Sequence, residues 1–432
     1  MVALPKNIIT TKSNDVMAFL YNLAIYGYYF LILIASLFNK KARQWIAGRK
    51  NLFNNIKTAI GKEQNIIWFH SASLGEFEQG RPVIESFRDK FPKHKILLTF
   101  FSPSGFEIRK NYTSADYIFY LPVDTRKNAK KFIKIIKPKL AFFIKYDFWY
   151  NYIDALSKAD IPIFFISAIF RKEQHFFKWY GVWFRKNLNK ISYFFVQNNE
   201  SENLLNSIGI KNVLVSGDTR FDRVFALAQQ KKPFPLFEQF KQNSEIFLAG
   251  STWPSDEELI LDLIKSNFHD LKFIIAPHET HKERIDSLVK NINTKVLRYS
   301  EATIKNINKA DILIIDSVGI LAHLYQYATI AYIGGGFGVD IHNIQEPVTF
   351  GKPVIFGPKY HKFQEARDLV ELGGAFSISS ISDLKKITIK LLKNQSYYLE
   401  CSEICKNYIL EKTGSTNKII NKINKFYEYK NN

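Results

Sequence analysis

One acidic residue, Glu76, stands where a buried strand is predicted to turn into a helix. The stretch Ile66–Gly80 reads IIWFHSASLGEFEQG, so an apolar run ends in small polar residues before Gly75 and Glu76 open the helix. This arrangement forms the ligand-facing edge of an α/β sheet. The helix dipole stabilises an ionised carboxylate there, which suits Glu76 to accept a proton. The alternative is that Glu76 is simply an acid in a first helical turn, and the rest of the chain must decide between the two.

A second group of residues suggests a nucleotide site. Gly334 to Gly336 follow a predicted strand, and glycines let backbone N–H groups approach an anion closely. The sequence HNIQEP comes next, with a helix start predicted near Gln345 that faces the ligand. Glu346 suits hydrogen bonding to ribose hydroxyls. A later GKPV at 351–354 makes the whole pattern stronger than a glycine run alone.

Other loops and missing motifs narrow the chemistry. Ala249–Trp253, Ala276–Glu279 and Asp316–Gly319 follow predicted strands, where open α/β sheets bind ligands. The sequence has no P-loop pattern and no G-x-G-x-x-G after its first strand, which excludes a P-loop NTPase and disfavours a dehydrogenase. It has no Asp-x-Asp placed to hold Mg²⁺ on a nucleotide diphosphate, which predicts that the donor substrate binds without a metal ion. Cys401 and Cys405 are expected to be reduced thiols, with no zinc site and no disulfide.

Short apolar runs alternate with amphipathic segments, and this alternation predicts the elements that position these residues. It is typical of parallel sheets with helices on both faces. A polar passage at Gln229–Asn243 reads as an interdomain linker, after which the alternation restarts. The predicted fold class is α/β with two Rossmann-like doubly wound domains, whose facing cleft is the expected active site. The predicted domains are an N-terminal membrane anchor at 1–45, a first Rossmann-like domain at 46–228, a second Rossmann-like domain at 244–395 and a helical tail at 396–432.

The N-terminal region predicts a membrane anchor. Val16–Phe38 contains 23 residues without a charge, and about 1.5 Å per residue spans roughly 30 Å of hydrocarbon. A cleaved signal peptide is disfavoured because the apolar region is too long, whereas a buried core helix and a helix lying in the bilayer surface remain alternatives. The following basic residues place the body of the protein in the cytoplasm by the positive-inside rule. They are Lys40, Lys41, Arg43, Arg49 and Lys50.

The net charge of +20 predicts an anionic partner, which is nucleic acid, acidic lipid or a phosphorylated substrate. The segment Phe170–Ile191 interleaves basic and aromatic residues, which suits a membrane interface or an amphiphilic substrate. A helix packed on the domain core with a solvated basic face explains this segment equally well.

Several motifs occur in an order that resembles one family over nearly the whole chain. They are HSASLGE, FSPSG, YLPVD, KPKLAFFIKYDFW, GDTRFD, AGSTW, APHE, DSVGIL, GGGF, HNIQEP and GKPVIFGP. Together they resemble the Kdo transferases, GT-B glycosyltransferases that move 3-deoxy-D-manno-octulosonic acid (Kdo) from CMP-Kdo to lipid A precursor. The resemblance implies an inverting reaction in lipopolysaccharide biosynthesis with no cofactor and no metal. The implied partners are CMP-Kdo, lipid IVA and membrane lipids, and the implied location is the cytoplasmic face of the inner membrane.

The resemblance also implies that the domain at 46–228 binds the acceptor, that the domain at 244–395 binds the CMP-sugar, and that individual residues have particular roles. Glu76 falls on the catalytic base, and Arg220 falls on a stabilising basic position where relatives usually carry lysine. Lys145 falls on a second stabilising position where many relatives carry an acid, and Asp147 matches the second acid of that run. The implied CMP-binding residues are Pro277, His278, Val318, Gly319, Ile320, Asn343, Ile344, Gln345 and Glu346. Relatives often carry Arg-His after the proline, so His281 and Arg284 are the alternatives here for contacts with phosphate and carboxylate.

Two other functions remain as alternatives at this point. The first is another GT-B-like nucleotide-sugar transferase or an epimerase, which would recognise UDP in place of CMP. The second is a membrane-tethered nucleic-acid binder, suggested by the net charge. The sequence shows no RRM, KH or helix-turn-helix pattern, so we expect no nucleic-acid partner.

Overall fold

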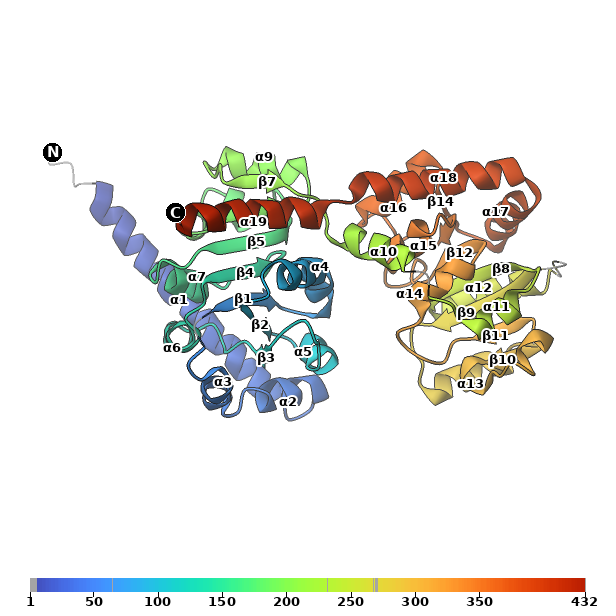
Figure 1. Cartoon of the computed structure of the whole chain (residues 1–432), viewed down its shortest axis with the longest axis horizontal. Coiled ribbons are helices and arrows are strands. Elements are labelled where there is room, and N and C mark those ends of the chain that lie inside the picture. The colour runs from blue at the N-terminus through green and yellow to red at the C-terminus, as the bar shows by residue number, and fades with distance from the viewer. Residues whose placement is uncertain (1–5, 64, 231, 267, 269–270, 432) are drawn as a thin grey trace. The chain divides into compact units, whose positions relative to one another are not determined.

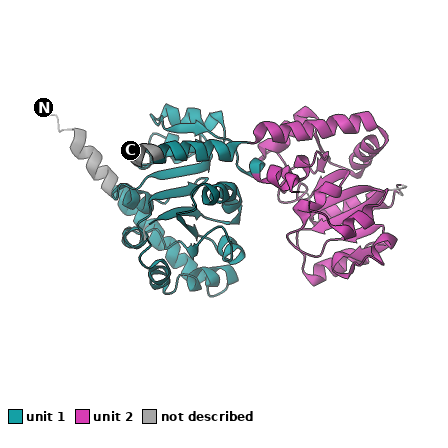
Figure 2. Ribbon diagram, in the orientation of Figure 1, with its two compact units in different colours: residues 1–222, 414–432 teal, residues 223–413 magenta. Residues whose placement is uncertain are grey.

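The computed structural model describes residues 6–63, 65–230, 232–266, 268 and 271–431. Two compact units make up the chain (Figures 1 and 2). Unit 1 contains residues 1–222 and 414–432, and unit 2 contains residues 223–413. The last part of the predicted tail therefore belongs to unit 1. Residues 1–5 of the predicted anchor and residue 432 of the tail lie outside the described residues.

Unit 1 is built on a parallel sheet of seven strands in the order β3-β2-β1-β4-β5-β6-β7. The strands are β1 (Ile66–Ser71), β2 (Lys95–Phe100), β3 (Tyr117–Tyr120), β4 (Leu140–Ile144), β5 (Ile163–Ala168), β6 (Tyr193–Val196) and β7 (Val213–Val215). The helices are α2 (Lys40–Ala47), α3 (Leu52–Ile60), α4 (Leu74–Lys90), α5 (Pro103–Arg109), α6 (Arg126–Ile136), α7 (Tyr150–Ser157), α8 (Val182–Leu188), α9 (Asn199–Ser207) and α19 (Ser415–Asn431). The central strands are apolar along their length because helices cover both faces of the sheet.

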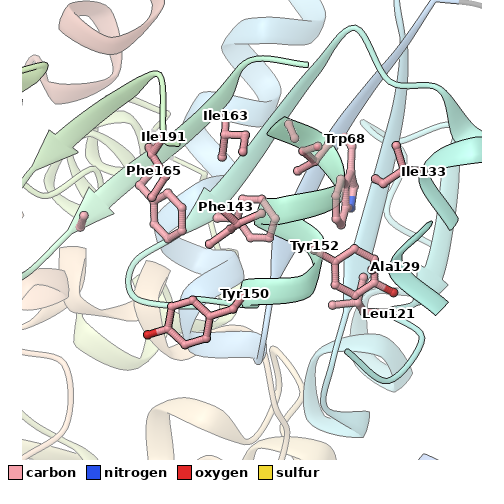
Figure 3. Packing of buried hydrophobic residues seen from close by; sticks show 14 of the residues in the cluster. Trp68, Leu121, Ala129, Ile133, Phe143, Tyr150, Tyr152, Ile163, Phe165 and Ile191 are labelled. Carbon is pink, nitrogen blue, oxygen red and sulfur yellow. The ribbon is translucent and has the colours of Figure 1, made fainter. Parts of the chain in front are cut away.

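Successive residues of a strand point to opposite faces, so unit 1 has two hydrophobic cores. Trp68 and Phe143 pack with Ile133 and Tyr152 from α6 and α7 on one face (Figure 3). Phe69 and Phe142 pack on the other face with apolar residues of α4 and α19. The helix α19 supplies Ile419, Ile420 and Ile423 to this second core, so unit 1 is completed by a helix that follows unit 2 in the sequence.

Unit 2 repeats the architecture with the strand order β10-β11-β9-β8-β12-β13-β14, again all parallel. Its strands are β8 (Glu245–Thr252), β9 (Leu271–Pro277), β10 (Val296–Arg298), β11 (Ile312–Ile314), β12 (Ile330–Ile333), β13 (Val354–Phe356) and β14 (Ala375–Ser377). Its helices are α11 (Pro235–Lys241), α12 (Pro254–Ile264), α13 (Lys282–Lys290), α14 (Leu321–Leu324), α15 (Gln345–Thr349), α16 (Gln364–Leu372), α17 (Ile381–Lys393) and α18 (Gln395–Lys412). The helix α10 (Arg220–Gln229) begins at the end of unit 1 and continues into unit 2.

The pair of doubly wound α/β units predicted from the alternating pattern is confirmed, but three strands were missed. These are β7, β10 and β14, and each has three residues and lies at an edge of its sheet. Short edge strands are exposed along one side and need no long apolar run. They therefore leave little periodic signal in the sequence.

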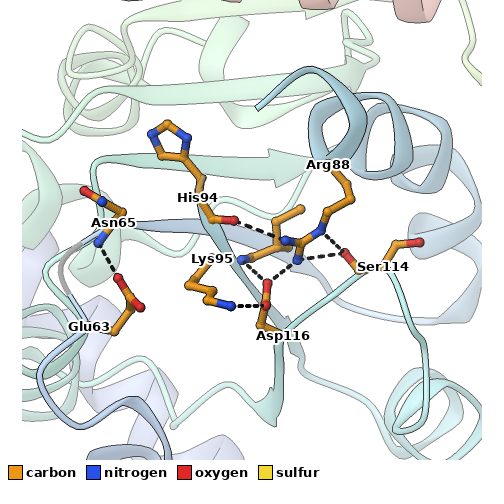
Figure 4. Close-up of polar contacts among 8 residues, drawn as sticks. Glu63, Asn65, Arg88, His94, Lys95, Ser114 and Asp116 are labelled. Carbon is orange, nitrogen blue, oxygen red and sulfur yellow. Dashed lines mark hydrogen bonds and ion pairs between the residues drawn. The ribbon is translucent and has the colours of Figure 1, made fainter. Parts of the chain in front are cut away.

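The helix α4, which carries Glu76, is held at its far end by a polar network (Figure 4). Arg88, in the last turn of α4, pairs with Asp116, and Asp116 also accepts from Lys95 Nζ at 3.0 Å and from the Ile96 N–H at 2.8 Å. Arg88 donates as well to the backbone carbonyl of His94 at 3.1 Å. These contacts fasten α4 to the amino end of β2, opposite to the sheet edge where Glu76 lies.

Gly80 allows α4, the helix that carries Glu76, to pack closely on the sheet, and this packing can be tested by substitution. A Cβ atom at Gly80 would lie 2.0 Å from Cδ1 of the buried Ile144 of β4, whereas a Cβ at Gly75 would meet only Ser73 Oγ at 3.8 Å. We expect Gly80→Val to lower the free energy of unfolding by about 1–3 kcal/mol because the core is overpacked. Gly75→Ala is the matched control on the same helix and is expected to raise stability by about 0.5–1 kcal/mol, since alanine favours the helix. Equal stability of the two variants in urea unfolding would contradict this packing argument.

Among the described residues, one helix is long and apolar enough to cross a membrane, namely the segment Val16–Ala35 of α1 (Lys6–Ala35). One stripe of α1 packs on unit 1 through Tyr21, Ile25, Tyr29 and Ile32. Its other side is exposed to solvent. The exposed large apolar residues are Val16, Phe19, Leu20, Leu23, Tyr26, Tyr28, Phe30, Leu31, Leu33 and Ile34.

Polar contacts also hold α1 against unit 1. The Tyr21 hydroxyl donates to Asp124, which is fully buried, and Asn151 Nδ2 donates to Asn22 Oδ1 at 3.2 Å. Arg49, one of the basic residues that follow α1, points into unit 1 and not toward solvent. Its guanidinium donates to the backbone carbonyls of Leu121 and Phe101 and lies over the Trp45 ring.

Candidate active site

Glu76 lies in the first turn of α4, directly after β1, as the sequence predicts. Ser73 is the N-cap of this helix, and its hydroxyl donates to the Glu76 carboxylate. The Glu76 side chain is half-buried, so one side of it faces solvent. The carboxylate is therefore fixed in direction while remaining accessible to a ligand.

Asp147 follows β4, the neighbour of β1 in the sheet, and lies near Glu76. Burial raises the pKa of Asp147 to about 8, and the negative charge of Glu76 adds to this effect. The Ala72 backbone N–H and the charge of Lys145 act in the opposite direction. In the described part of the chain the buried Oδ2 atom of Asp147 has no hydrogen-bond partner. Burial therefore favours the protonated form of the Asp147 carboxyl group.

His70, to which the sequence analysis assigned no role, supports this loop. It is fully buried at the end of β1, and burial lowers its pKa to about 3. Its Nδ1 lies 3.1 Å from the Thr99 carbonyl, to which it donates, and its Nε2 accepts from Trp149 Nε1 at 2.9 Å. The neutral ring thereby fixes Trp149 and the loop that carries Asp147. The contact of 3.8 Å between His70 Nε2 and Asp147 Oδ2 is consequently not an ion pair.

The raised pKa of Asp147 predicts a dependence of stability on pH. Between the unfolded pKa near 4 and the folded pKa of about 8, the folded state holds one proton more than the unfolded state. The free energy of unfolding therefore falls as pH rises through this window. We expect Asp147→Asn to gain a few kcal/mol of stability relative to the parent protein between about pH 5 and about pH 8. Urea unfolding of both proteins at several pH values measures the difference, and a difference that does not change with pH would contradict the buried, protonated state.

Lys145 joins the same edge of the sheet. It follows β4 with a left-handed backbone (φ of 70°), and its N–H donates to the Ile166 carbonyl at 2.9 Å. Its ammonium nitrogen lies 5.0 Å from the centre of the Tyr146 ring, and its charge reaches Asp147. The structure therefore brings Glu76, Lys145 and Asp147 together at the carboxyl ends of β1 and β4.

Arg220 lies beyond β7 and is held by Asp218. Its Nε and Nη2 atoms donate to Asp218 Oδ2 at 2.9 and 2.7 Å, and its backbone N–H donates to Oδ1 at 2.9 Å. Between them, the Thr219 hydroxyl donates to the backbone carbonyl of Gln79 on α4. This contact ties the Arg220 loop to the helix of Glu76, and Asp218 sets the direction of the guanidinium group.

In unit 2, three aromatic rings stack where β8, β9 and β12 end. The His278 ring lies 4.7 Å from the Trp253 ring and 4.5 Å from the His342 ring, with both pairs nearly parallel. Trp253 Nε1 donates to His342 Nε2 at 3.1 Å, and burial together with the charge of His278 lowers the pKa of His342 to about 4. The His342 ring is thus neutral, and it stacks on the His278 ring. The sequence analysis assigned it no role, although it directly precedes Asn343. The exposed ring of His278 is left as a flat surface for a ligand.

The loop Gly334 to Gly336 does not act as the anion-binding loop that the sequence predicts. The Gly334 N–H donates to the Gly250 carbonyl at 2.9 Å, and the Gly335 N–H donates to Asp256 Oδ2 at 2.8 Å. A Cβ at Gly334 would lie 2.3 Å from the Ser251 carbonyl oxygen, and one at Gly336 would lie 2.6 Å from the Gly357 nitrogen. The expectation that this loop offers its N–H groups to an anion is therefore wrong for Gly334 and Gly335, because close packing of the protein's own loops explains the glycines.

The predicted residues Asn343 to Glu346 form the start of α15. Asn343 Oδ1 accepts from the Gln345 N–H at 3.1 Å, and Asn343 Nδ2 donates to Glu346 Oε1 at 3.3 Å. The side chains of Ile344 and Gln345 are buried, and Gln345 Nε2 donates to Glu365 at 3.3 Å. Ligand contacts of Ile344 and Gln345 are therefore restricted to the main chain, whereas the Asn343 and Glu346 side chains are half-buried.

The remaining predicted contacts lie on two neighbouring loops of unit 2. Pro277 is buried at the end of β9, and Val318 is 82 % exposed beside Gly319, which has a φ of 96° and open space around it. Ile320 precedes α14.

His281 and Arg284, the alternatives for contacts with phosphate and carboxylate, differ in their surroundings. Arg284 pairs with the buried Glu257, whereas His281 is exposed and caps α13. No group of three His, Cys, Asp or Glu side chains suitable for a metal occurs among the described residues.

Comparison with known families places this geometry in context. Residues 47–223, which make up most of unit 1, match the family model described as 3-Deoxy-D-manno-octulosonic-acid transferase (kdotransferase). The 3-deoxy-D-manno-octulosonic acid transferase of Aquifex aeolicus is 27% identical over 82% of this chain and 95% of its own length. The transferases of the same name from Haemophilus influenzae and Rickettsia felis are 26% and 28% identical and cover 84% and 78% of this chain. The matched parts are 86% and 74% of those two proteins.

Solved structures are similar to this chain in fold. The UDP-GlcNAc 2-epimerase of Neisseria meningitidis bound to UDP-GlcNAc matches with a TM-score of 0.59 and 18% identity, over 83% of this chain and 100% of that one. A putative UDP-N-acetylglucosamine 2-epimerase from Listeria monocytogenes matches with a TM-score of 0.59 and 12% identity, over 85% and 97%. With the two seven-stranded parallel sheets, these likenesses confirm the predicted GT-B fold.

Proposed function

We propose that this chain, which is similar to 3-deoxy-D-manno-octulosonic acid (Kdo) transferases over most of its length, is a GT-B glycosyltransferase of that family and moves Kdo from CMP-Kdo to the lipid A precursor lipid IVA. The observation that carries the proposal is the grouping of Glu76, Lys145 and Asp147 at one edge of the unit 1 sheet. That edge lies within the part of the chain that matches the family model.

The proposed reaction is a direct displacement with inversion at the anomeric carbon of the sugar. Glu76 takes the proton of the acceptor's primary hydroxyl as that oxygen attacks the anomeric carbon. The bond from that carbon to the phosphate oxygen breaks, and CMP leaves as the anion. Because burial raises the pKa of Asp147 and favours its protonated form, we assign the role of base to Glu76 and not to Asp147. Lys145 and Arg220 stabilise the negative charge that develops on the leaving group.

The nucleotide is proposed to bind unit 2 without a metal ion. His278 offers the exposed ring of the aromatic stack, and Glu346 offers a half-buried carboxylate for the ribose hydroxyls. Pro277, Val318 to Ile320 and Asn343 to Gln345 complete the proposed site.

The proposed location is the cytoplasmic face of the inner membrane, with α1 as a signal anchor. The segment Val16–Ala35 is apolar enough to insert into a bilayer. Lys40, Lys41, Arg43 and Lys50 follow it and favour a cytoplasmic body. This location places the enzyme beside an acceptor that stays in the membrane.

Incubation of the full chain with CMP-Kdo and lipid IVA, followed by mass spectrometry of the lipid, tests the proposal. The expected product is the acceptor carrying one or more Kdo units. An unchanged acceptor, under conditions where a known Kdo transferase modifies it, would reject the proposed reaction. Competition by CMP and not by UDP is expected, and the reverse result would favour a UDP-sugar enzyme.

A further inference from the structure

A large basic groove lies on unit 1 between α6, α7 and α8, and we call it the α6–α7 groove. It has a volume of about 1070 Å³ and reaches Ala18 of α1. Eight cationic side chains line it, which are Arg126, Lys130, Lys134, Lys137, Lys139, Lys158, Lys186 and Lys190. One carboxylate lines it, that of Asp154. The whole chain has 60 Lys and Arg for 40 Asp and Glu, so general basicity does not explain a ratio of eight to one.

The cations are arranged as a continuous stripe. Arg126, Lys130, Lys134 and Lys137 are spaced by four, four and three residues, which places them on one face of α6 and the turn that follows it. On the other wall, Asp154 accepts from Lys158 Nζ and Lys190 Nζ at 2.7 Å each, so its charge is already offset.

The other six cations have no carboxylate partner among the described residues. They are Arg126, Lys130, Lys134, Lys137, Lys139 and Lys186. Like charges gathered along a groove repel one another, and a polyanionic ligand would relieve that repulsion.

Apolar groups meet this charge at the end nearest α1. Trp183 and Tyr150 line the groove and contact Tyr21 of α1, Trp183 with a tilted ring at 5.8 Å and Tyr150 edge-to-face at 5.0 Å between ring centres. Directly beside Ala18, Phe19 is 65 % exposed on the same helix. A ligand with an anionic head and an apolar tail fits this combination better than a nucleic acid, which has no use for the exposed face of α1.

The groove is separate from the proposed catalytic residues, because Glu76, Lys145, Asp147 and Arg220 do not line it. It does use residues of the basic and aromatic segment Phe170–Ile191, namely Trp183, Lys186 and Lys190. The groove therefore accounts for a sequence feature that the proposed reaction leaves unexplained.

We infer that the α6–α7 groove binds the phosphate-bearing headgroup of a membrane lipid whose acyl chains lie along the exposed face of α1. The inference rests on the proposed membrane location, but it does not require the proposed reaction. The same phosphate chemistry is offered by an acidic phospholipid of the bilayer and by a phosphorylated acceptor lipid. The experiment is therefore designed to separate these two sources.

The test measures binding of three lipids to the full chain in neutral detergent micelles, without CMP-Kdo. The lipids are phosphatidylcholine, phosphatidylglycerol and an acylated glucosamine disaccharide bisphosphate. We expect the double variant Lys130→Gln/Lys134→Gln to bind phosphatidylglycerol roughly 30-fold more weakly than the parent, since each basic residue near a lipid surface contributes about 1 kcal/mol. The control Lys127→Gln/Lys211→Gln changes the net charge equally outside the groove and is expected to weaken binding less than about threefold.

Each outcome has a defined meaning. Equal losses for phosphatidylglycerol and the disaccharide bisphosphate support a general phosphate headgroup site, and a loss confined to the disaccharide bisphosphate assigns the groove to the acceptor lipid. Unchanged binding of both lipids overturns the inference, as does an equal loss in the control variant. A loss confined to oligonucleotide binding in a parallel titration overturns it in favour of nucleic acid. Since no turnover is measured, none of these results depends on the proposed reaction.

Discussion

Replacing Glu76 with glutamine is expected to lower turnover by about 10²–10⁴-fold, the usual contribution of a general base. Glutamine keeps the size of the side chain and still accepts a hydrogen bond from the Ser73 hydroxyl, which contacts the carboxylate in the parent protein. It cannot take up the acceptor's proton. Turnover of CMP-Kdo with lipid IVA gives the rate, and CMP affinity by calorimetry is expected to stay at the parent value.

Glu85→Gln provides the matched control on the same helix. Glu85 accepts from Arg81 Nε at 2.8 Å and from the Tyr112 hydroxyl at 3.1 Å, away from the proposed site. Its replacement removes an equal charge from α4 and is expected to leave turnover unchanged. Parent-like turnover of Glu76→Gln would show that Glu76 is only an acid in a first helical turn, which was the alternative that the sequence left open.

The second large effect is expected at Asp256, a fully buried carboxylate in the first turn of α12. Its Oδ2 accepts from the backbone N–H groups of Trp253 and Gly335 at 2.9 and 2.8 Å, and its Oδ1 accepts from the Tyr332 hydroxyl at 2.8 Å. Alanine would leave these donors buried without an acceptor. We expect Asp256→Ala to lower the free energy of unfolding by about 2–5 kcal/mol and to weaken CMP binding, because the loops of Trp253 and Gly335 lose their common anchor.

Asparagine at position 256 discriminates between lost hydrogen bonds and other causes. Its Oδ1 atom can accept both backbone N–H groups while its Nδ2 donates to the Tyr332 oxygen, so we expect a loss of about 1 kcal/mol. Asp262→Ala, on the exposed side of α12 where Asp262 pairs with Lys265 at 2.8 Å, is expected to leave the urea midpoint unchanged. Equal losses for Asp256→Ala and Asp256→Asn would contradict the account of the buried carboxylate as a hydrogen-bond acceptor.

The fold was predictable where the sequence carries strong periodic signals. Buried parallel strands such as β1 and β4 are continuous apolar runs, and the turn after β1 is marked by small residues before Glu76. The edge strands β7, β10 and β14 carry no such signal, because three half-exposed residues do not need a long apolar pattern. The resemblance to a family gave the GT-B fold its name, but periodicity alone predicted the two doubly wound units.

The candidate site was predictable in its residues but less so in its interactions. Sequence placed Glu76, Lys145 and Asp147 at strand ends, whereas the burial that raises the pKa of Asp147 depends on the packing of His70 and Trp149. The same limit explains the glycine loop. A run of three glycines is consistent with anion binding or with close contact between loops, and only the folded structure shows that Gly334 and Gly336 lie against the protein's own backbone. The burial of the Ile344 and Gln345 side chains likewise depends on packing that the sequence does not show.

The return of α19 to unit 1 has a consequence for how the protein is made. The strands of unit 1 leave the ribosome early, but Ile419, Ile420 and Ile423 can close the core over α4 only after residues 223–413 of unit 2 have been synthesised. Throughout the translation of unit 2, the nascent chain therefore presents an uncovered apolar face beside the helix that carries Glu76. A protein chain truncated after residue 413 would contain every strand of both sheets, and yet the apolar face that α19 covers would stay exposed. The unit that carries Glu76 is thus completed by a helix that is synthesised after all of unit 2.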